Sequence, residues 1–334
     1  MEEKKQAQDI LLKINNFRLH YNTREEVYEA VNGVSFNLKK GTTLGLVGET
    51  GAGKTSIALA IMGLLPIPPA RIIEGEILFN GEDLLKKDAK EMRRIRGNRI
   101  SMIFQDPMTA LNPVLRVGDQ IMEVIKLHDK ISKAEAEVKA HEVLQMVGIE
   151  DDRFNDYPHQ FSGGMKQRVV IAMALVCRPE LIIADEPTTA LDVTIQAQVL
   201  SMMKSLRDEI RTSMLLITHD LGIVAENCDE CAIIYAGEIM ERGTIRDIFG
   251  NPLHPYTLGL FNSIPSLDKE VERLTPIPGL ASDPTNLPEY CSFCDRCPMH
   301  IEKCRQVDPE TVEVSPGHFV KCHLVSEGSA SAER

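Results

Sequence analysis

Short, almost uninterrupted apolar runs predict a buried parallel β-sheet. Three of them span residues 43–47, 181–184 and 214–218. A strand of a parallel sheet is covered on both faces, so it reads as a continuous apolar run rather than as an alternation of apolar and polar residues. Residues 33–38 read as a further β-rich segment ahead of the first run. We expect these runs to form the centre of the fold.

Helical patterns separate the predicted strands. Residues 55–65 form an apolar helical run that Pro66 closes, and residues 169–177 form another. Residues 122–148 are also helical in pattern, and a capping box, Ser-Lys-Ala-Glu at residues 132–135, opens a helix there. Strands that alternate with helices are typical of an α/β fold. We predict an α/β domain that carries a helical subdomain at about residues 105–165.

The pattern changes near residue 250. Residues 231–243 read as two β segments around Ala236 and Gly237, and prolines become frequent beyond them. We predict one domain over residues 1–250 and a small extension, rich in proline and cysteine, over residues 251–334. The polar tail at residues 327–334 reads as disordered.

A glycine-rich segment supplies the first chemistry. Residues 48–55 read Gly-Glu-Thr-Gly-Ala-Gly-Lys-Thr and lie between a predicted strand and a predicted helix. In such a loop, backbone N–H groups curve around phosphates, Lys54 reaches the outer phosphates and the Thr55 hydroxyl can ligate Mg²⁺. The alternative is a glycine-rich turn without a ligand. The segment predicts a site for a nucleoside triphosphate.

Two adjacent carboxylates, Asp185 and Glu186, follow the apolar run at residues 181–184. Ligands of open α/β sheets bind at the carboxyl ends of the strands. Asp185 is placed to hold Mg²⁺ through water, and Glu186 is placed to polarise the water that attacks the γ-phosphate. A solvated acidic loop is the alternative interpretation.

The order of the motifs points to a family. Residues 162–164, Ser-Gly-Gly, precede the helical run at residues 169–177, where a serine can cap the helix and an anion can bind. The phosphate loop, Gln105, the Ser-Gly-Gly signature, the Asp-Glu pair and His219 follow one another as in ABC ATPases. Over about residues 11–243 the chain resembles that family.

This resemblance implies roles for single residues. Gln105 resembles the family's glutamine that ligates Mg²⁺ and orients the attacking water, and His219 resembles the switch histidine that bonds the γ-phosphate. Taken alone, either residue could be purely structural. Asp192 falls in the segment that resembles the D-loop, which crosses to a second subunit. Tyr21, rather than Tyr28, is the residue expected to stack on adenine.

The expected site residues form four groups. The catalytic residues are Glu186, His219 and Gln105, and the Mg²⁺ ligands are Thr55, Gln105 and Asp185. The ATP-binding residues are Tyr21, Gly48, Glu49, Thr50, Gly51, Ala52, Gly53, Lys54, Thr55 and Ser56. The signature residues Ser162, Gly163, Gly164 and Gln167 are expected to complete the nucleotide site of a second subunit. ATP would thus close a dimer, hydrolysis would reopen it, and this cycle would drive transport.

Two further segments resemble the ATPases of oligopeptide and dipeptide importers. They are residues 105–113, Gln-Asp-Pro-Met-Thr-Ala-Leu-Asn-Pro, and residues 254–257, His-Pro-Tyr-Thr. An ordinary proline-bounded turn is the alternative for the second. The resemblance implies a second, related ATPase subunit, two membrane permease subunits and, indirectly, an extracytoplasmic peptide-binding protein. It also implies a peripheral position on the cytoplasmic face of the membrane.

Charge and length limit the other functions. The formal net charge of −12 and the pI near 5.3 argue against nucleic acid as a partner, since phosphate contacts need a basic face. The charged start of the chain does not resemble a secretory signal. The longest apolar run has nine residues, whereas a membrane-spanning helix needs about 20. The remaining alternatives are a soluble ABC ATPase acting on nucleic acid, an importer of another cargo such as nickel, and a redox-regulated iron–sulfur protein.

Five of the eight cysteines lie in the extension: Cys291, Cys294, Cys297, Cys304 and Cys322. The ferredoxin spacing is incomplete, which disfavours an electron carrier. The importer subfamily shows cysteines separated by five, six and seventeen residues, and this spacing selects Cys291, Cys297, Cys304 and Cys322, with Cys294 as an extra. We expect these four to hold a four-iron four-sulfur cluster, with tetrahedral zinc as the second choice and metal-free thiols as the alternative. Cys177, Cys228 and Cys231 are expected to be small buried hydrophobes.

Overall fold

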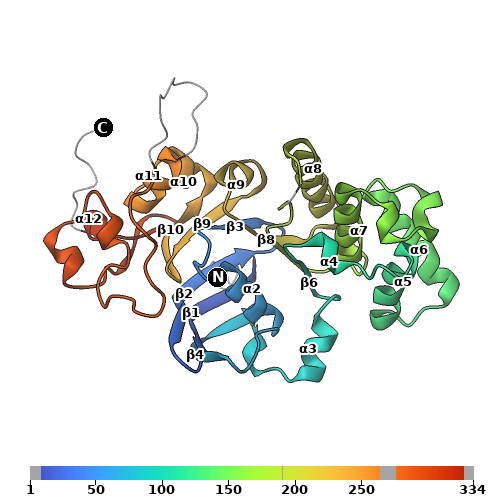
Figure 1. Cartoon of the computed structure of the whole chain (residues 1–334), viewed down its shortest axis with the longest axis horizontal. Helices are drawn as coiled ribbons and strands as arrows, with labels where there is room; N and C mark the ends of the chain where they lie inside the picture. The colour runs from blue at the N-terminus through green and yellow to red at the C-terminus, as the bar shows by residue number, and fades with distance from the viewer. Residues whose placement is uncertain (1–8, 190, 264–275, 327–334) are drawn as a thin grey trace.

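The computed structural model describes residues 9–189, 191–263 and 276–326. The charged start of the chain, Ala190 and the polar tail at residues 327–334 lie outside the described residues. Helices α5, α6 and α7 occupy one end of the long axis of the molecule and the extension with α11 and α12 occupies the other (Figure 1).

The predicted parallel sheet is confirmed as the centre of an eight-stranded sheet with the order β11-β12-β10-β9-β3-β8-β7-β6. Five neighbouring strands pair in parallel: β3 (Thr43–Val47), β6 (Ile100–Ile103), β7 (Leu181–Asp185), β8 (Ser213–Thr218) and β9 (Glu230–Tyr235). Every residue of β3, β7 and β8 is buried. Alternate residues face two separate core clusters: Ile183 and Leu215 belong to one, and Ile182 and Leu216 to the other. This two-sided burial explains the continuous apolar runs.

A second, antiparallel sheet lies beside the central one, and of its strands only residues 33–38 show a clear β pattern in the sequence. It contains β1 (Ile10–Asn22), β2 (Val27–Lys39), β4 (Ala70–Phe79) and β5 (Glu82–Asp83). Helix α2 (Lys54–Met62) packs between this sheet and the central one, since residues of α2, β1, β2, β3 and β4 share one core cluster. Helix α2 ends at the left-handed Gly63, with φ of 60°, and not at Pro66 as expected.

The helical part shares its core with the other face of the parallel sheet. Its helices are α4 (Pro107–Ala110), α5 (Val117–His128), α6 (Lys133–Met146) and α7 (Gly163–Leu175). The capping box of Ser132 and Glu135 is present at the start of α6, and Ser162 caps α7. Further α-helices in the described part of the chain are α3 (Ala89–Ile95), α8 (Val193–Ile210), α9 (Leu221–Asn227) and α10 (Ile245–Gly250).

The extension continues the central sheet. Its strand β12 (His318–Lys321) pairs with β10 (Glu238–Thr244), and β11 (Thr311–Ser315) pairs with β12. Its helices are α11 (Pro255–Asn262) and α12 (His323–Ser326). The buried carboxylate of Glu241 accepts hydrogen bonds from the backbone N–H groups of Leu253 and His254, each at 2.9 Å, and contacts His318 Nε2 at 2.8 Å. One fully buried acid of β10 thus anchors two separate segments of the extension.

The three cysteines outside the extension differ in their burial. Cys231 is buried as expected, whereas Cys177 and Cys228 are only partly buried. Burial raises the pKa of the Cys177 thiol to about 11 and that of Cys228 to about 12, so both are protonated thiols at neutral pH.

The first prediction concerns His254, which is 1% exposed and whose Nδ1 accepts a hydrogen bond from the N–H of Tyr256 at 3.0 Å. Burial lowers the pKa of His254 to about 4. The unfolded chain therefore takes up a proton at His254 that the folded chain does not, between about pH 6.5 and 4. This residue should lower stability on acidification by roughly 1.4 kcal/mol per pH unit in that window.

The comparison variant is His254→Asn, whose side-chain oxygen can accept the same bond without titrating. Denaturant unfolding at pH 7.5 and 5.5 should show a smaller loss of stability on acidification in the variant than in the parent chain. An equal loss in both proteins would contradict the prediction.

Candidate nucleotide site

The phosphate loop leaves the carboxyl end of β3 and enters α2. At Gly48 a Cβ atom would lie 2.1 Å from the carbonyl oxygen of Ile234, and at Gly53 it would lie 2.3 Å from that of Ala30. Gly53 also has φ of 93°, which side chains rarely adopt. The loop therefore fits between β2 and β9 only with glycine at both positions.

Lys54 lies at the centre of this loop and is 6% exposed. Its Nζ donates to the carbonyl oxygens of Gly48 at 2.7 Å and Glu49 at 2.9 Å. Burial lowers the pKa of Lys54, while the nearby charges of Glu186, Asp185 and Glu49 raise it and offset part of that effect. The ammonium group is held where the loop curves, as phosphate binding requires.

Asp185 and Thr55 form an oxygen-rich corner beside the lysine. Asp185 is buried at the end of β7, and the Thr55 hydroxyl forms a hydrogen bond with its carboxylate. The pKa of Asp185 is raised overall, because the effect of burial exceeds the opposing effect of the hydrogen bond from Thr55. Carboxylate and hydroxyl oxygens are the donors that Mg²⁺ prefers, so the residues present fit this ion.

The Glu186 carboxylate contacts side chains from two distant segments and one from its own loop. Its carboxylate accepts bonds from Gln105 Nε2 and from the Thr189 hydroxyl, both at 3.0 Å, and lies 3.3 Å from His219 Nδ1. Burial raises the pKa of Glu186, but the bonds from His219 and Thr189 and the charge of Lys54 lower it overall. Glu186 also has φ of 46°, a strained backbone conformation of a kind that recurs at functional sites. The carboxylate is ionised and oriented, as a general base must be.

Lys54, Thr55 and Glu186 line one cavity of about 480 Å³, whereas the predicted site residues Asp185, Gly48, Glu49 and Ala52 do not line it. The cavity is lined by Tyr21, Tyr28, Ala30, Thr50, Gly51, Gly53, Lys54, Thr55, Ser56, Gln105, Glu186, His219 and Pro284. Tyr21 and Tyr28 are direct cross-strand neighbours, and the Tyr21 hydroxyl donates to the Ser56 hydroxyl at 3.1 Å. The phosphate loop and the predicted catalytic side chains therefore share one space.

The predicted signature residues are not among the residues that line this cavity. Ser162 is exposed at the start of α7, and its hydroxyl accepts a bond from the N–H of Met165. Gln167 is fully buried, and its amide donates to the carbonyl oxygen of Pro187, so in this conformation it supports the loop after Glu186. Asp192 caps α8 through the N–H of Ile195. These residues therefore lie outside the cavity of their own chain.

Sequence reasoning missed three residues of the extension that reach the site. Arg296 Nη1 lies 3.0 and 2.9 Å from the two carboxylate oxygens of Glu49, and the N–H of Glu49 donates to the Tyr256 hydroxyl at 3.2 Å. Pro284 lines the cavity. Of these three residues, only Tyr256 lies in a segment that the sequence singles out, the His-Pro-Tyr-Thr segment at residues 254–257. Arg296 had no such signal, because its partner Glu49 lies 247 positions away in the chain.

The five cysteines of the extension are buried or partly buried, but their side chains are not arranged as a set of metal ligands. Cys291, Cys294, Cys304 and Cys322 are buried and Cys297 is partly buried. Burial, together with the neighbouring thiols, raises the pKa of Cys291 to about 12 and that of Cys297 to about 11. Among the described residues, no group of three or more His, Cys, Asp or Glu side chains is arranged to hold a metal ion. The expected metal centre is therefore not supported by the geometry, although the thiol chemistry suits one.

No helix within the described ranges is both long and apolar enough to span a bilayer.

Two family models match the chain. The model described as "ABC transporter" matches residues 31–189, and the one described as "Oligopeptide/dipeptide transporter, C-terminal region" matches residues 240–304. The oligopeptide transport ATP-binding protein AppD of Bacillus subtilis is 48% identical, over 96% of this chain and 98% of its own. The dipeptide transport ATP-binding protein DppD of the same organism is 49% identical, over 96% and 97%.

Solved structures share the fold. A dimeric ATP-binding cassette in a post-hydrolysis state, bound to ADP and Pi, has a TM-score of 0.64 at 28% identity and covers 71% of this chain and 99% of its own. The cbiO1 protein of Clostridium perfringens, part of an ABC transporter complex, has a TM-score of 0.64 at 26% identity, over 73% and 92%.

The second prediction separates the two tyrosines that line the cavity. Stacking of a base on an aromatic ring contributes about 1–3 kcal/mol. Tyr21→Ala should therefore raise the Kd for ATP by about tenfold, measured by calorimetric titration, and the matched variant Tyr28→Ala should change it by less than about twofold. A larger effect of Tyr28→Ala would assign adenine to Tyr28 instead.

Proposed function

Since the chain belongs to the ATP-binding proteins of ABC transporters, within the oligopeptide and dipeptide group, we propose that it hydrolyses ATP to power the import of peptides. The observation that carries the proposal is the arrangement of Gln105, Thr189 and His219 around the Glu186 carboxylate, beside Lys54 in one cavity. The names of the relatives refer to peptides, which favours this cargo over nickel and over a function on nucleic acid.

The reaction divides among the residues of the cavity. Lys54 and the loop N–H groups bind the β- and γ-phosphates. Thr55, Asp185 and Gln105 would hold Mg²⁺, which would supply positive charge to neutralise the phosphates. The Glu186 carboxylate accepts a hydrogen bond from the attacking water and orients this water toward the γ-phosphorus. His219 contacts Glu186 and lies on the same cavity, so it can donate to a γ-phosphate oxygen. Tyr21 stacks on adenine.

The proposed active state is a dimer of ATPase subunits. The signature residues do not line the cavity of their own chain, and Ser162 is exposed at the N-terminus of a 13-residue helix. A helix N-terminus attracts anions, so this end of α7 can cover the γ-phosphate bound to a partner. ATP would then hold the two chains together and hydrolysis would release them. We propose that the partner is a related, non-identical ATPase.

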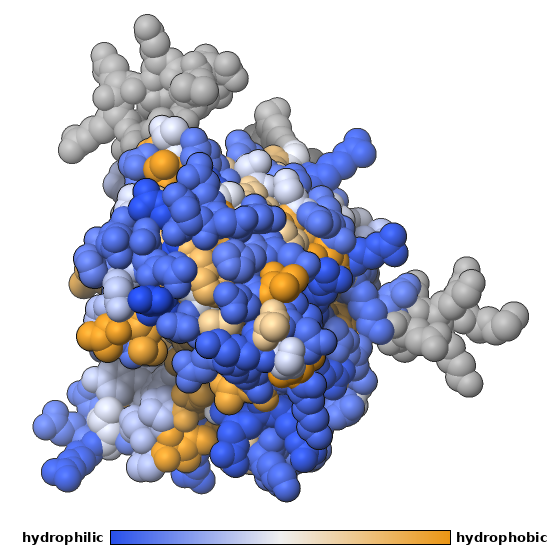
Figure 2. Space-filling view, turned by 90° about the vertical axis from the view of Figure 1, so that its right-hand side faces the viewer, coloured by the Kyte–Doolittle hydropathy of each residue, from blue (hydrophilic) through white to orange (hydrophobic). Residues whose placement is uncertain are grey.

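The proposed contact with the membrane permeases lies beside Gln105. An apolar pocket of about 270 Å³ is lined by Leu64, Met102, Phe104, Ala110, Val124 and Met173, among others. Phe104 is 45% exposed and directly precedes Gln105, which is bonded to Glu186. Apolar patches also occur on the face that carries the helical part (Figure 2). A permease segment seated here would place the chain on the cytoplasmic side of the membrane and would couple its movement to the catalytic base.

The finer proposal for the extension is a metal centre held by Cys291, Cys297, Cys304 and Cys322. Cys291, Cys304 and Cys322 are buried and Cys297 is partly buried, which supports this proposal, and thiolates are suitable donors for iron–sulfur clusters and for zinc. The thiols would have to move together to bind the metal and would lose their protons on binding. The centre would stabilise a segment with little regular secondary structure.

The third prediction tests the base. In Glu186→Gln the shape of the site is kept but the ionised carboxylate is lost, so ATP turnover by the assembled transporter should fall at least about 100-fold. The Kd for ATP should stay within about threefold of the parent value, and the ATPase dimer should persist in ATP during size-exclusion chromatography. The control is Glu209→Gln, an exposed glutamate of α8. Turnover at the parent rate in Glu186→Gln would contradict the assignment.

The fourth prediction tests the metal centre by metal analysis and absorption spectroscopy on protein purified without oxygen. Iron and sulfide with absorption near about 400 nm are expected. Cys297→Ser should lose the metal and keep ATP binding, whereas Cys177→Ser, a cysteine outside the extension, should keep both. Colourless protein with stoichiometric zinc would replace the cluster by a zinc site, and protein without metal would refute both.

A further inference from the structure

One arginine of the extension contacts the phosphate loop directly. Arg296 lies at the end of a 3₁₀ turn, Cys294–Arg296, and is followed at once by Cys297. Its Nη1 lies 2.9 and 3.0 Å from the two carboxylate oxygens of Glu49. The arginine side chain is 8% exposed and that of Glu49 is 28% exposed. The ion pair is largely shielded from water, where charge-assisted hydrogen bonds are strong.

Other contacts fix both partners. Arg296 Nε donates to the carbonyl oxygen of Pro278 at 3.0 Å, and the guanidinium lies over the ring of Tyr235, 5.5 Å from its centre. The backbone N–H of Glu49 donates to the Tyr256 hydroxyl. Residues of the extension thus hold both the side chain and the backbone of Glu49.

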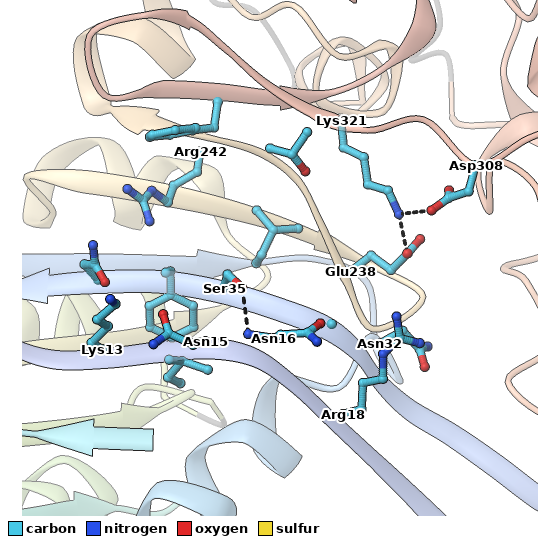
Figure 3. Close-up of a pocket in the computed structure, with 17 residues that line it drawn as sticks. Lys13, Asn15, Asn16, Arg18, Asn32, Ser35, Glu238, Arg242, Asp308 and Lys321 are labelled. Atoms are coloured by element: carbon cyan, nitrogen blue, oxygen red, sulfur yellow. Dashed lines mark hydrogen bonds and ion pairs between the residues drawn. The ribbon is translucent and has the colours of Figure 1, made fainter. Parts of the chain in front are cut away.

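The extension also meets the antiparallel sheet, where the N–H of Glu29 in β2 donates to the carbonyl oxygen of Pro284 at 2.8 Å, but another part of this boundary is open. A crevice of about 430 Å³ separates β1 and β2 from β12 and the preceding loop, and Lys321 extends into it to pair with Glu238 and Asp308 (Figure 3). Arg296, Tyr256 and Glu49 do not line this crevice, and Tyr256 belongs to a buried cluster that the extension shares with Val47 and Tyr235. The contact of Arg296 and Tyr256 with Glu49 is a direct connection between the extension and the phosphate loop.

The negative charge of Glu49 affects the binding of a triphosphate in the loop. Glu49 belongs to the loop that receives the phosphates, and its carboxylate acts on Lys54, whose pKa it raises. An uncompensated carboxylate at this place would repel a triphosphate. Arg296 neutralises it and fixes its position. The segment after Gly48 is consequently held both by Lys54 from inside the loop and by Arg296 from outside.

We propose that Arg296 is a positioning residue for ATP: it neutralises and orients Glu49, so that the conformation of the turn at residues 294–297 sets the affinity of the phosphate loop. This inference rests on the proposed function, since it assumes that ATP binds in this cavity. It assigns the extension a part in nucleotide binding. By linkage, any change in the turn that displaces Arg296 changes ATP affinity, and ATP binding in turn stabilises the turn.

The experiment measures the Kd of the full chain for a non-hydrolysable ATP analogue with Mg²⁺ by calorimetric titration. Arg296→Gln should raise this Kd about tenfold, because it leaves the Glu49 carboxylate unpaired beside the phosphates. Adding Glu49→Gln to Arg296→Gln should restore the Kd to within about threefold of the parent, since the repelling charge is then gone. The matched control is Arg305→Gln, which removes a half-exposed arginine of the same extension that pairs with Asp295.

Thermal unfolding of every variant shows whether it is folded. Two results overturn the inference: an unchanged Kd in Arg296→Gln, or equal losses of affinity in Arg296→Gln and in the double variant, which would mean a merely structural role. Recovery in the double variant supports it even if Arg296→Gln lowers the unfolding temperature. Failure of the parent chain to bind the analogue would contradict the proposed function itself, and with it the inference about Arg296.

Discussion

The site depends on the meeting of β3, β7 and β8 at one edge of a parallel sheet. The phosphate loop leaves β3, Asp185 ends β7, and His219 follows β8. Because parallel strands share a direction, their carboxyl ends converge, and groups far apart in the sequence come within hydrogen-bond distance. His219 and Glu186 are 33 residues apart and lie 3.3 Å from each other. The rest of the chain either covers this sheet or adds groups to its edge.

The parts of the fold that the sequence predicted are those in which local pattern and tertiary environment agree. The strand at residues 43–47 is apolar because both of its faces are buried, and the capping boxes lie within a few residues of the helices that they begin. The long strands β1 and β4 were not predicted, because buried and exposed residues alternate irregularly along them. A β-bulge between Ile14 and Phe17, with Asn16 at φ of 41°, breaks the period-two pattern further.

The same distinction applies to the site. The phosphate loop could be predicted from its fixed spacing, and Gln105, Glu186 and His219 from the order of the motifs along the chain. These three residues line the same cavity as Lys54. Arg296 could not be predicted, since its partner Glu49 lies 247 residues away and no local pattern records such a contact. The cysteine spacing predicted a ligand set that the side chains do not form as they are placed. Spacing specifies which residues can converge, whereas distances within the folded chain decide whether they do.

Buried charges explain why the extension can transmit a change rather than merely cover the domain. Glu241 and Glu238 of β10 are each bonded to the extension, through His318, Ser292 and Lys321. Removing one partner of such a buried pair costs far more than removing both, so these contacts fix the extension in one arrangement relative to β10. With β10 fixed in this way, a movement of the turn at residues 294–297 cannot be absorbed by sliding of the whole extension. It must act on the contacts that the turn itself makes, and one of these is the ion pair of Arg296 with Glu49.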